Sequence, residues 1–220
     1  MLTPKKIEFI EFMMSAEVLR FGDFITKSGR RTPYFINTGN YKTGAQIATL
    51  GKYYAALVQE TVGDNFTAMF GPAYKGIPLA TSCAAQLYTL YGMDKPYFFN
   101  RKEAKDHGEG GSLIGYKPLD GDKIIIIEDV ITAGTAVRET LPVLQAAAKV
   151  TVEDMFISVN RCEVGQTPGK TAITEVEEEF GIKVHALVTV EDIRDYLIQK
   201  GGYEELVERM KEYMEQYCVL

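Results

Sequence analysis

A run of four isoleucines at 124–127 constrains the fold of this chain more than any other feature. Branched residues that are apolar at every position predict a strand buried on both faces of a sheet. Further short apolar runs predict strands, and segments with helical periodicity separate most of them; these runs lie at 66–70, 96–100, 152–159 and 184–190. The alternation predicts an α/β fold with a central, mostly parallel sheet flanked by helices.

Helical patterns cover the N-terminus and most connections between the expected strands. Ile7, Ile10, Met14 and Val18 recur at helical spacing, which predicts an amphipathic helix at the start of the chain. Further helices are expected at 44–62, at about 78–91, after the turn at 132–136 through Ala148, and at 203–217. Residues 21–36 predict short strands broken at 28–31 and at Pro33. The length suits a single domain that covers residues 1–220.

Charge and cysteine usage exclude several classes of function. The formal net charge is −6, and a phosphate backbone attracts basic surfaces, so we expect no nucleic-acid partner. Cys83, Cys162 and Cys218 form no C-x-x-C pair, which argues against a zinc site or a disulfide framework and favours a reducing compartment. No apolar run approaches the ~20 residues that cross a bilayer, and the N-terminus lacks the apolar core of a signal peptide. We therefore expect a cytoplasmic protein without a membrane partner.

Two adjacent acids follow the isoleucine run, and a threonine- and glycine-rich turn comes directly after them. Glu128 and Asp129 would lie at the carboxyl end of a buried strand, which is where ligands bind in such sheets. Thr132, Gly134 and Thr135 offer hydroxyls and an unhindered backbone at a helix start, where a phosphate is attracted. The ligand implied is a sugar phosphate, although a solvated acidic turn before a threonine-capped helix fits the same residues.

A glycine-rich charged segment occupies 101–111. Arg101, Lys102, Lys105 and His107 are interleaved there with acidic residues. A flexible loop of this composition can close over a polyanion, supply positive donors and exclude water. Composition alone also fits a solvated charged loop. Of the residues in the loop, His107 is the candidate for acid–base work or pyrophosphate binding.

Three further segments carry weaker signals, and each has a structural alternative. Residues 71–78 contain two glycines that permit close approach to a ligand, together with Lys75, but a tight turn between a strand and a helix needs the same glycines. Residues 27–35 fit a surface hairpin. Arg161 follows the expected strand 152–159 and suits recognition of a carboxylate, or is simply a surface arginine. His185 lies inside an expected strand, and we interpret it as structural.

These motifs together resemble one enzyme family. The string Glu-Asp-Val-Ile-Thr-Ala-Gly-Thr-Ala at 128–136 resembles the phosphoribosyl-pyrophosphate motif of type I phosphoribosyltransferases. Residues 100–111 resemble the catalytic loop of the orotate phosphoribosyltransferases in that family, 71–78 resemble its pyrophosphate loop, and 27–35 resemble its hood over orotate. The resemblance implies the type I phosphoribosyltransferase fold, in which residues 1 to about 40 contribute the N-terminal helix and a small hood.

The same resemblance assigns roles to residues of these loops, and it implies a non-proline cis peptide near 73–74. The implied residues that bind phosphoribosyl pyrophosphate are Lys27, Tyr74, Lys75, Arg101, Lys102, Lys105, His107, Glu128, Asp129, Val130, Ile131, Thr132, Ala133, Gly134, Thr135 and Ala136. The implied orotate-binding residues are Phe35, Ile36, Thr132 and Arg161. The implied catalytic residues are Lys105, His107, Arg101 and Asp129.

The implied activity is transfer of the ribose-5-phosphate of phosphoribosyl pyrophosphate to orotate, giving orotidine 5′-monophosphate and pyrophosphate in the biosynthesis of UMP. The implied cofactor is Mg²⁺, carried mainly by the phosphoribosyl donor, so no protein ligand of the metal is assigned. The implied assembly is a homodimer whose 101–111 loop works in the partner's site, with Arg101, Lys105 and His107 acting in trans and Lys102 within its own subunit. Two alternatives stay open: a phosphoribosyltransferase for another nucleobase, and a regulator that binds phosphoribosyl pyrophosphate without chemistry.

Overall fold

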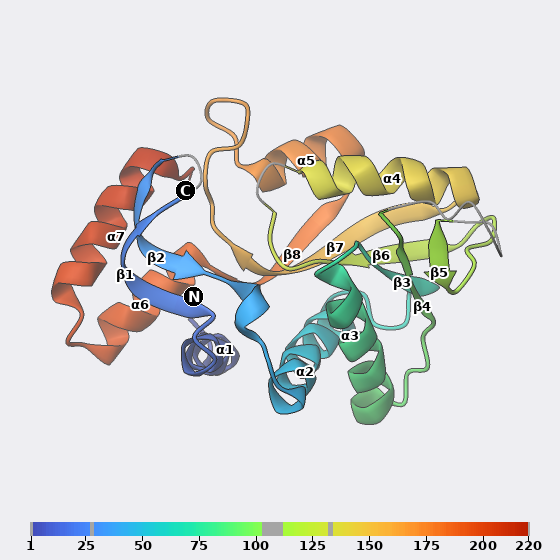
Figure 1. Cartoon of the computed structure of the whole chain (residues 1–220), viewed down its shortest axis with the longest axis horizontal. Helices are drawn as coiled ribbons and strands as arrows, with labels where there is room; N and C mark the ends of the chain where they lie inside the picture. The colour runs from blue at the N-terminus through green and yellow to red at the C-terminus, as the bar shows by residue number, and fades with distance from the viewer. Residues whose placement is uncertain (1, 27–28, 103–111, 132–133, 220) are drawn as a thin grey trace.

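The structure is a computed structural model that describes residues 2–26, 29–102, 112–131 and 134–219. Its centre is a six-stranded sheet in the order β5-β4-β3-β6-β7-β8 (Figure 1). The strands are β3 (Ala68–Gly71), β4 (Tyr97–Asn100), β5 (Leu113–Gly115), β6 (Lys123–Ile127), β7 (Thr151–Asn160) and β8 (Lys183–Thr189). Neighbours pair in parallel except β4 and β5, which pair antiparallel. The predicted, mostly parallel sheet is therefore confirmed.

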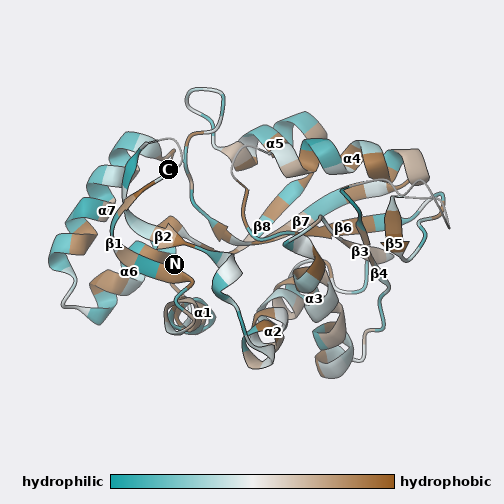
Figure 2. Cartoon of the chain, viewed as in Figure 1, coloured by the Kyte–Doolittle hydropathy of each residue, from teal (hydrophilic) through white to brown (hydrophobic). Residues whose placement is uncertain are grey.

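Helices cover both faces of this sheet, as the isoleucine run predicted. One face carries α2 (Gly44–Thr61) and α3 (Gly76–Tyr91), and the other carries α4 (Thr135–Ala147) and α5 (Ala172–Phe180) (Figure 1). Ile125 and Ile127 pack into the hydrophobic cluster on the α2 and α3 side, whereas Ile124 and Ile126 pack into the cluster on the α4 side. Because side chains alternate along a strand, β6 belongs to both cores. Figure 2 shows β3 and β6 in the hydrophobic colour and α7 mostly in the hydrophilic one.

A second group of elements lies at one end of the sheet (Figure 1). It contains an antiparallel hairpin and three helices, namely β1 (Leu19–Ile25), β2 (Arg31–Ile36), α1 (Pro4–Ser15), α6 (Val190–Lys200) and α7 (Glu204–Tyr217). Tyr34 of β2 packs edge-on against Tyr213 of α7, with ring centroids 5.7 Å apart. One cluster of buried apolar side chains runs from α1 through this group to α3. We call the β1–β2 hairpin with α1 the hood.

Some predictions about individual elements were wrong. The first helix ends at Ser15 rather than reaching Val18, because Glu17 takes a positive φ of 56° and the chain turns into β1. Pro33 does not break a strand: it lies within β2 at a register irregularity of the hairpin, where its missing N–H costs no ladder hydrogen bond. The short strand β5 and the helices α5 and α6 were not predicted. Within the described ranges, no helix is long and apolar enough to cross a membrane.

Candidate active site

The two acids at the end of β6 are both buried, and Asp129 is the better stabilised of the two. Glu128 and Asp129 are only 7% and 6% exposed. Asp129 Oδ2 accepts from Thr38 Oγ1 at 2.6 Å and from Lys75 Nζ at 2.8 Å, while its Oδ1 accepts from the N–H of Val130 at 2.8 Å. Burial opposes the ionised form, but the hydrogen bonds from Lys75 and Thr38 outweigh it and lower the pKa of Asp129. Asp129 is therefore a carboxylate at neutral pH.

Glu128 differs from its neighbour because no cation in the described part of the chain forms an ion pair with it. Its Oε1 accepts from the N–H of Asp129 at 2.9 Å. Burial is the main cause that raises the pKa of Glu128, the hydrogen bond from the N–H of Asp129 partly offsets it, and the charge of Asp129 adds to it, which gives a pKa of about 8. Two adjacent carboxylates are costly to bury unless they are exposed or paired. The structure instead pairs one acid and favours the protonated form of the other.

Side chains from other elements hold the backbone under these acids. Tyr54 of α2 is fully buried, and its hydroxyl donates to the carbonyl of Glu128 at 2.7 Å. Ser158 of β7 donates to the carbonyl of Asp129 twice, from its hydroxyl at 2.7 Å and from its N–H at 2.9 Å. Sequence reasoning missed Thr38, Tyr54 and Ser158. Thr38 lies 91 residues from its partner Asp129, so no local pattern announces the contact.

The turn after the acids leads into α4 through a left-handed glycine. Gly134 is the N-cap residue of α4, with φ of 68°, and no side chain of the described residues caps the helix. A Cβ atom at Gly134 would lie 2.9 Å from both Arg138 Nη1 and Val176 Cγ2, so only glycine fits. The threonine-capped helix that the sequence left open is not observed. An uncapped helix start presents its N–H groups to an anion.

The loop between β3 and α3 brings two more candidate residues to the same edge of the sheet. The Ala73–Tyr74 peptide bond is cis, as predicted from the resemblance. The N–H of Ala73 donates to Asn100 Oδ1 at the end of β4, at 2.9 Å. Tyr74 is exposed, and Lys102 Nζ lies 5.4 Å from the centroid of its ring. Lys75 reaches Asp129, so this loop joins the end of β4 to the end of β6.

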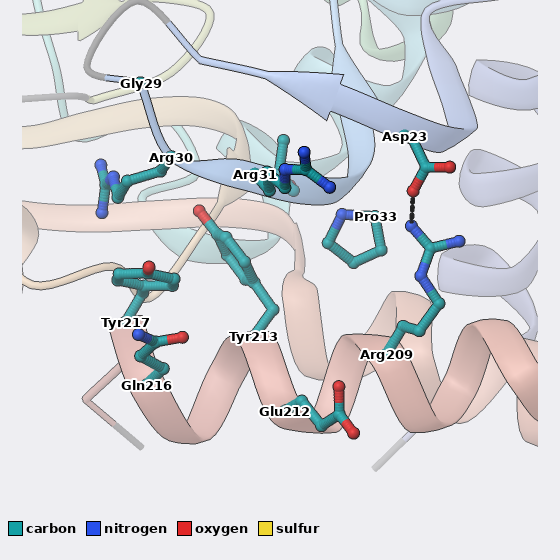
Figure 3. A pocket seen from close by; sticks show the side chains of 11 residues that line it. Asp23, Gly29, Arg30, Arg31, Pro33, Arg209, Glu212, Tyr213, Gln216 and Tyr217 are labelled. Atoms are coloured by element: carbon teal, nitrogen blue, oxygen red, sulfur yellow. Dashed lines mark hydrogen bonds and ion pairs between the residues drawn. The ribbon is translucent and has the colours of Figure 1, made fainter.

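Two cavities bear on where the site lies, and they differ in the residues that line them. A cavity of about 390 Å³ lies beside Asp129 and Lys75; its other lining residues are Thr38, Gly39, Tyr41, Lys42, Thr43, Gly44, Ile47, Pro78 and Leu79. A larger groove of about 630 Å³ lies between the β1–β2 hairpin and α7 (Figure 3). Of the candidate site residues that the structure describes, none lines the larger groove. Since ligands bind beyond the carboxyl ends of parallel strands, we assign the chemistry to the smaller cavity.

The candidate orotate residues lie at the hood and past the end of β7. Arg161 is not a surface arginine: its half-buried guanidinium donates from Nη2 to Glu163. Burial opposes its charge, but Glu163 outweighs burial and raises the pKa of Arg161 above its usual value. Phe35 stacks against Phe24 at 5.4 Å between centroids, and Ile36 is half-buried at the end of β2.

The remaining candidate residues are placed as follows. Arg101 is half-buried and its N–H donates to the carbonyl of Ser112 at 2.7 Å, whereas Thr135 is exposed at the start of α4. His185 Nε2 forms a hydrogen bond of 2.6 Å with Asp154 Oδ1, and its ring stacks on Phe156. These contacts agree with a structural role. The predictions on Lys27, Lys105, His107, Thr132 and Ala133 lie outside the described residues.

Comparisons with known proteins agree with this geometry. The model of the phosphoribosyl transferase domain family matches residues 37–153. An orotate phosphoribosyltransferase of Clostridium acetobutylicum is 51% identical, over 97% of this chain and 98% of that protein. One from Haemophilus influenzae is 46% identical, over 97% of this chain and 98% of that protein. A crystal structure of the Francisella tularensis orotate phosphoribosyltransferase superposes with a TM-score of 0.85 at 36% identity, covering 96% of this chain and 99% of that one.

The structural match confirms the predicted type I phosphoribosyltransferase fold, and the sequence identities extend over nearly the whole chain. The chain therefore belongs to the phosphoribosyltransferase family and, within it, to the orotate phosphoribosyltransferases.

Proposed function

We propose that this protein transfers the ribose-5-phosphate of phosphoribosyl pyrophosphate to orotate, giving orotidine 5′-monophosphate and pyrophosphate in pyrimidine biosynthesis. The observation that carries the proposal is the convergence of three features at one sheet edge. These are the buried Glu128–Asp129 pair, Lys75 at 2.8 Å from Asp129, and the uncapped start of α4 at Gly134. A sugar phosphate with a pyrophosphate group needs hydroxyl acceptors, a cation and an anion cradle in this arrangement.

The phosphate and the ribose of the donor occupy opposite ends of the β6–α4 turn in this proposal. The 5-phosphate binds at the start of α4, where free N–H groups and the helix dipole attract an anion. The ribose hydroxyls donate to the acids that follow β6. The residues to which we assign donor binding along this turn are Glu128, Asp129, Val130, Ile131, Thr132, Ala133, Gly134, Thr135 and Ala136.

Binding of the donor has a consequence for Lys75. In the free protein its ammonium group is paired with Asp129. The pyrophosphate is a stronger anion, so Lys75 turns to it and leaves Asp129 Oδ2 available for a ribose hydroxyl. Tyr74 and Lys102 lie beside this path and contribute to the pyrophosphate side. We assign the same role to Lys27, which lies outside the described residues.

The reaction is a displacement at the anomeric carbon. The orotate ring nitrogen forms the new bond and gives up its proton, the bond to pyrophosphate breaks with both electrons leaving on oxygen, the departing pyrophosphate takes up a proton, and the configuration inverts. The sugar gains oxocarbenium character, which Asp129 stabilises through the ribose hydroxyls and its own charge. Arg101, Lys105 and His107 neutralise the departing pyrophosphate, and His107 is the candidate to protonate it.

Mg²⁺ fits this site as an ion that arrives with the donor. Among the described residues, no three His, Cys, Asp or Glu side chains converge to hold a metal. In the proposed complex Asp129 is bound by Thr38 and by a ribose hydroxyl, and the pKa of Glu128 is raised to about 8. When bound to the donor, the ion would supply charge neutralisation at the pyrophosphate oxygens.

In this proposal, orotate is recognised by a charged pair between its carboxylate and Arg161, and by residues of the hood. The planar guanidinium of Arg161 suits the orotate carboxylate, which purine bases and uracil lack. Phe35, Ile36 and Thr132 complete the base site. This arrangement favours orotate over the alternative of another nucleobase.

We also propose a homodimer in which the 101–111 loop closes over the partner's site, so that Arg101, Lys105 and His107 act in trans. Large apolar side chains are exposed on the elements that precede this loop, namely Tyr88, Leu90 and Tyr91 of α3 and Tyr97 of β4. Exposed aromatic residues of this kind are enriched in subunit interfaces. A cytoplasmic location is supported by the three free cysteines.

The test is the loss of absorbance as orotate becomes orotidylate, with phosphoribosyl pyrophosphate and Mg²⁺ present. We expect turnover with orotate and none when uracil or adenine replaces it, with release of pyrophosphate followed in parallel. Equal turnover of uracil would refute the role of Arg161, and binding of the donor without any turnover would favour a regulator.

A further inference from the structure

Glu163 is a nearly buried acid that the proposed reaction does not use. It lies two residues after Arg161, and its side chain is 11% exposed. Three donors from three parts of the chain converge on its carboxylate. Arg161 donates to Oε1, the Tyr213 hydroxyl donates to the same oxygen at 2.8 Å, and Arg30 Nη2 donates to Oε2 at 3.2 Å.

These donors come from segments that are far apart in sequence. Arg30 directly precedes β2 of the hood, and Tyr213 belongs to α7. Figure 3 shows the two side chains between the facing hairpin and helix, at one end of the larger groove. Glu163 therefore joins the hood, the C-terminal helix and the segment after β7 through one carboxylate.

Backbone contacts fix the same segment to the C-terminal tail. Glu163 forms an antiparallel bridge with Cys218, and the N–H of Val219 donates to the carbonyl of Cys162 at 2.8 Å. On the other side, the N–H of Val164 donates to the carbonyl of Tyr217 at 2.9 Å. The position of the Glu163 carboxylate is thus set by backbone hydrogen bonds as well as by its own partners.

This arrangement leaves part of the Arg161 guanidinium available. Its Nη2 is bound to Glu163, but no acceptor among the described residues is bound to its Nε or Nη1. A guanidinium that is fixed through one nitrogen and has donors left without an acceptor can receive a second carboxylate with little loss of side-chain entropy. These remaining donors suit the carboxylate of the base substrate.

We propose that Glu163 is a positioning residue for orotate recognition. It orients the Arg161 guanidinium for the orotate carboxylate and couples that orientation to the hood and to α7. The inference rests on the proposed function, because it concerns how that activity selects its base. It also gives the C-terminal helix a role, because Tyr213 of α7 donates a hydrogen bond to Glu163, and Glu163 in turn binds Arg161.

The test compares Glu163→Gln with Glu212→Gln in steady-state kinetics of the full-length enzyme. Glu163→Gln keeps the shape but removes the charge between Arg30 and Arg161, so we expect KM for orotate to rise about tenfold. KM for phosphoribosyl pyrophosphate should stay within about twofold, because Lys75 and Asp129 lie outside the changed contacts. Glu212→Gln makes the same chemical change at an exposed position of α7 and should leave both constants unchanged.

A second variant keeps the test decisive if Glu163→Gln does not fold. Tyr213→Phe removes one donor from Glu163 and retains the ring, so KM for orotate should rise about threefold. The inference would be overturned if the variants changed KM for orotate and KM for phosphoribosyl pyrophosphate equally, or left KM for orotate unchanged. In that case, turnover of orotate by the wild-type protein would still support the proposed function. A wild-type protein without orotate turnover would instead refute the proposed function, and the inference with it.

Discussion

Replacing Thr38 by valine removes one hydroxyl from the carboxylate of Asp129 and keeps the shape of the side chain. Thr38 Oγ1 lies 2.6 Å from Asp129 Oδ2, and Asp129 is buried. A hydrogen bond to a charged group contributes about 1.5–3 kcal/mol. Lys75 remains on the same oxygen and retains part of the stabilisation. We therefore expect the free energy of unfolding to fall by about 1.5–2 kcal/mol near neutral pH.

The loss should depend on pH, because the hydroxyl of Thr38 stabilises the ionised form of Asp129. Burial opposes ionisation, but the hydrogen bonds from Lys75 and Thr38 lower the folded-state pKa below its ordinary value. A carboxyl with a lowered folded-state pKa contributes stability that is present above its unfolded-state pKa, about 4. That stability disappears as the pH falls through the folded-state pKa. The difference between wild type and variant should therefore shrink in acid.

Urea unfolding of wild type, Thr38→Val and Thr38→Ser at neutral and acidic pH measures this difference. Thr38→Ser keeps the hydroxyl and should lose less stability than Thr38→Val at neutral pH. An equal loss for Thr38→Val at both pH values, or a loss below about 0.5 kcal/mol at neutral pH, would contradict the assignment of Thr38 to the Asp129 carboxylate.

Three further changes test other parts of the account. Lys105→Ala should lower kcat by about 10²–10³-fold without changing the thermal unfolding temperature, and an unchanged rate would remove the loop from the mechanism. Glu128 has a raised folded-state pKa of about 8, so its proton stabilises the fold at low pH and that stability is lost as the pH rises towards this value. Glu128→Gln should abolish this decline, which is at most about 1.4 kcal/mol per pH unit, and unfolding curves with the same pH slope in both proteins would refute it. Gly76→Ala would place Cβ 2.6 Å from Pro72 Cδ and 2.9 Å from Ile127 O. A loss of about 1–3 kcal/mol in chemical unfolding is expected, and wild-type stability would show that the loop packs more loosely.

Much of the fold could be predicted because its signals are local. Four isoleucines in succession can only be buried on both faces, and the structure places alternate members in two separate cores. The helix 44–61 begins at a Thr43 capping box, which the sequence displays directly. The strand β5 has only three residues, too few to show a period. The position of Pro33 depends on a register irregularity that no local pattern reveals.

The site residues also separate into those with a local sequence signal and those whose role depends on the folded chain. Glu128, Asp129 and Gly134 could be identified because they form one contiguous string. Thr38 could not, because Asp129 lies far away in the sequence, and Glu163 could not, because its partners Arg30 and Tyr213 lie far away and only the fold brings them to the pair with Arg161. The unequal pKa values of the two acids also depend on burial and on Lys75, which only the folded chain brings together.

The central claim is that the edge of the sheet at β6 and α4 captures the phosphoribosyl donor. Isothermal titration of folded protein with phosphoribosyl pyrophosphate and Mg²⁺ tests it most directly, because it needs neither orotate nor turnover. We predict a saturable heat with one site per chain, and a weaker one for Asp129→Asn. No detectable heat from the wild-type protein would contradict the account.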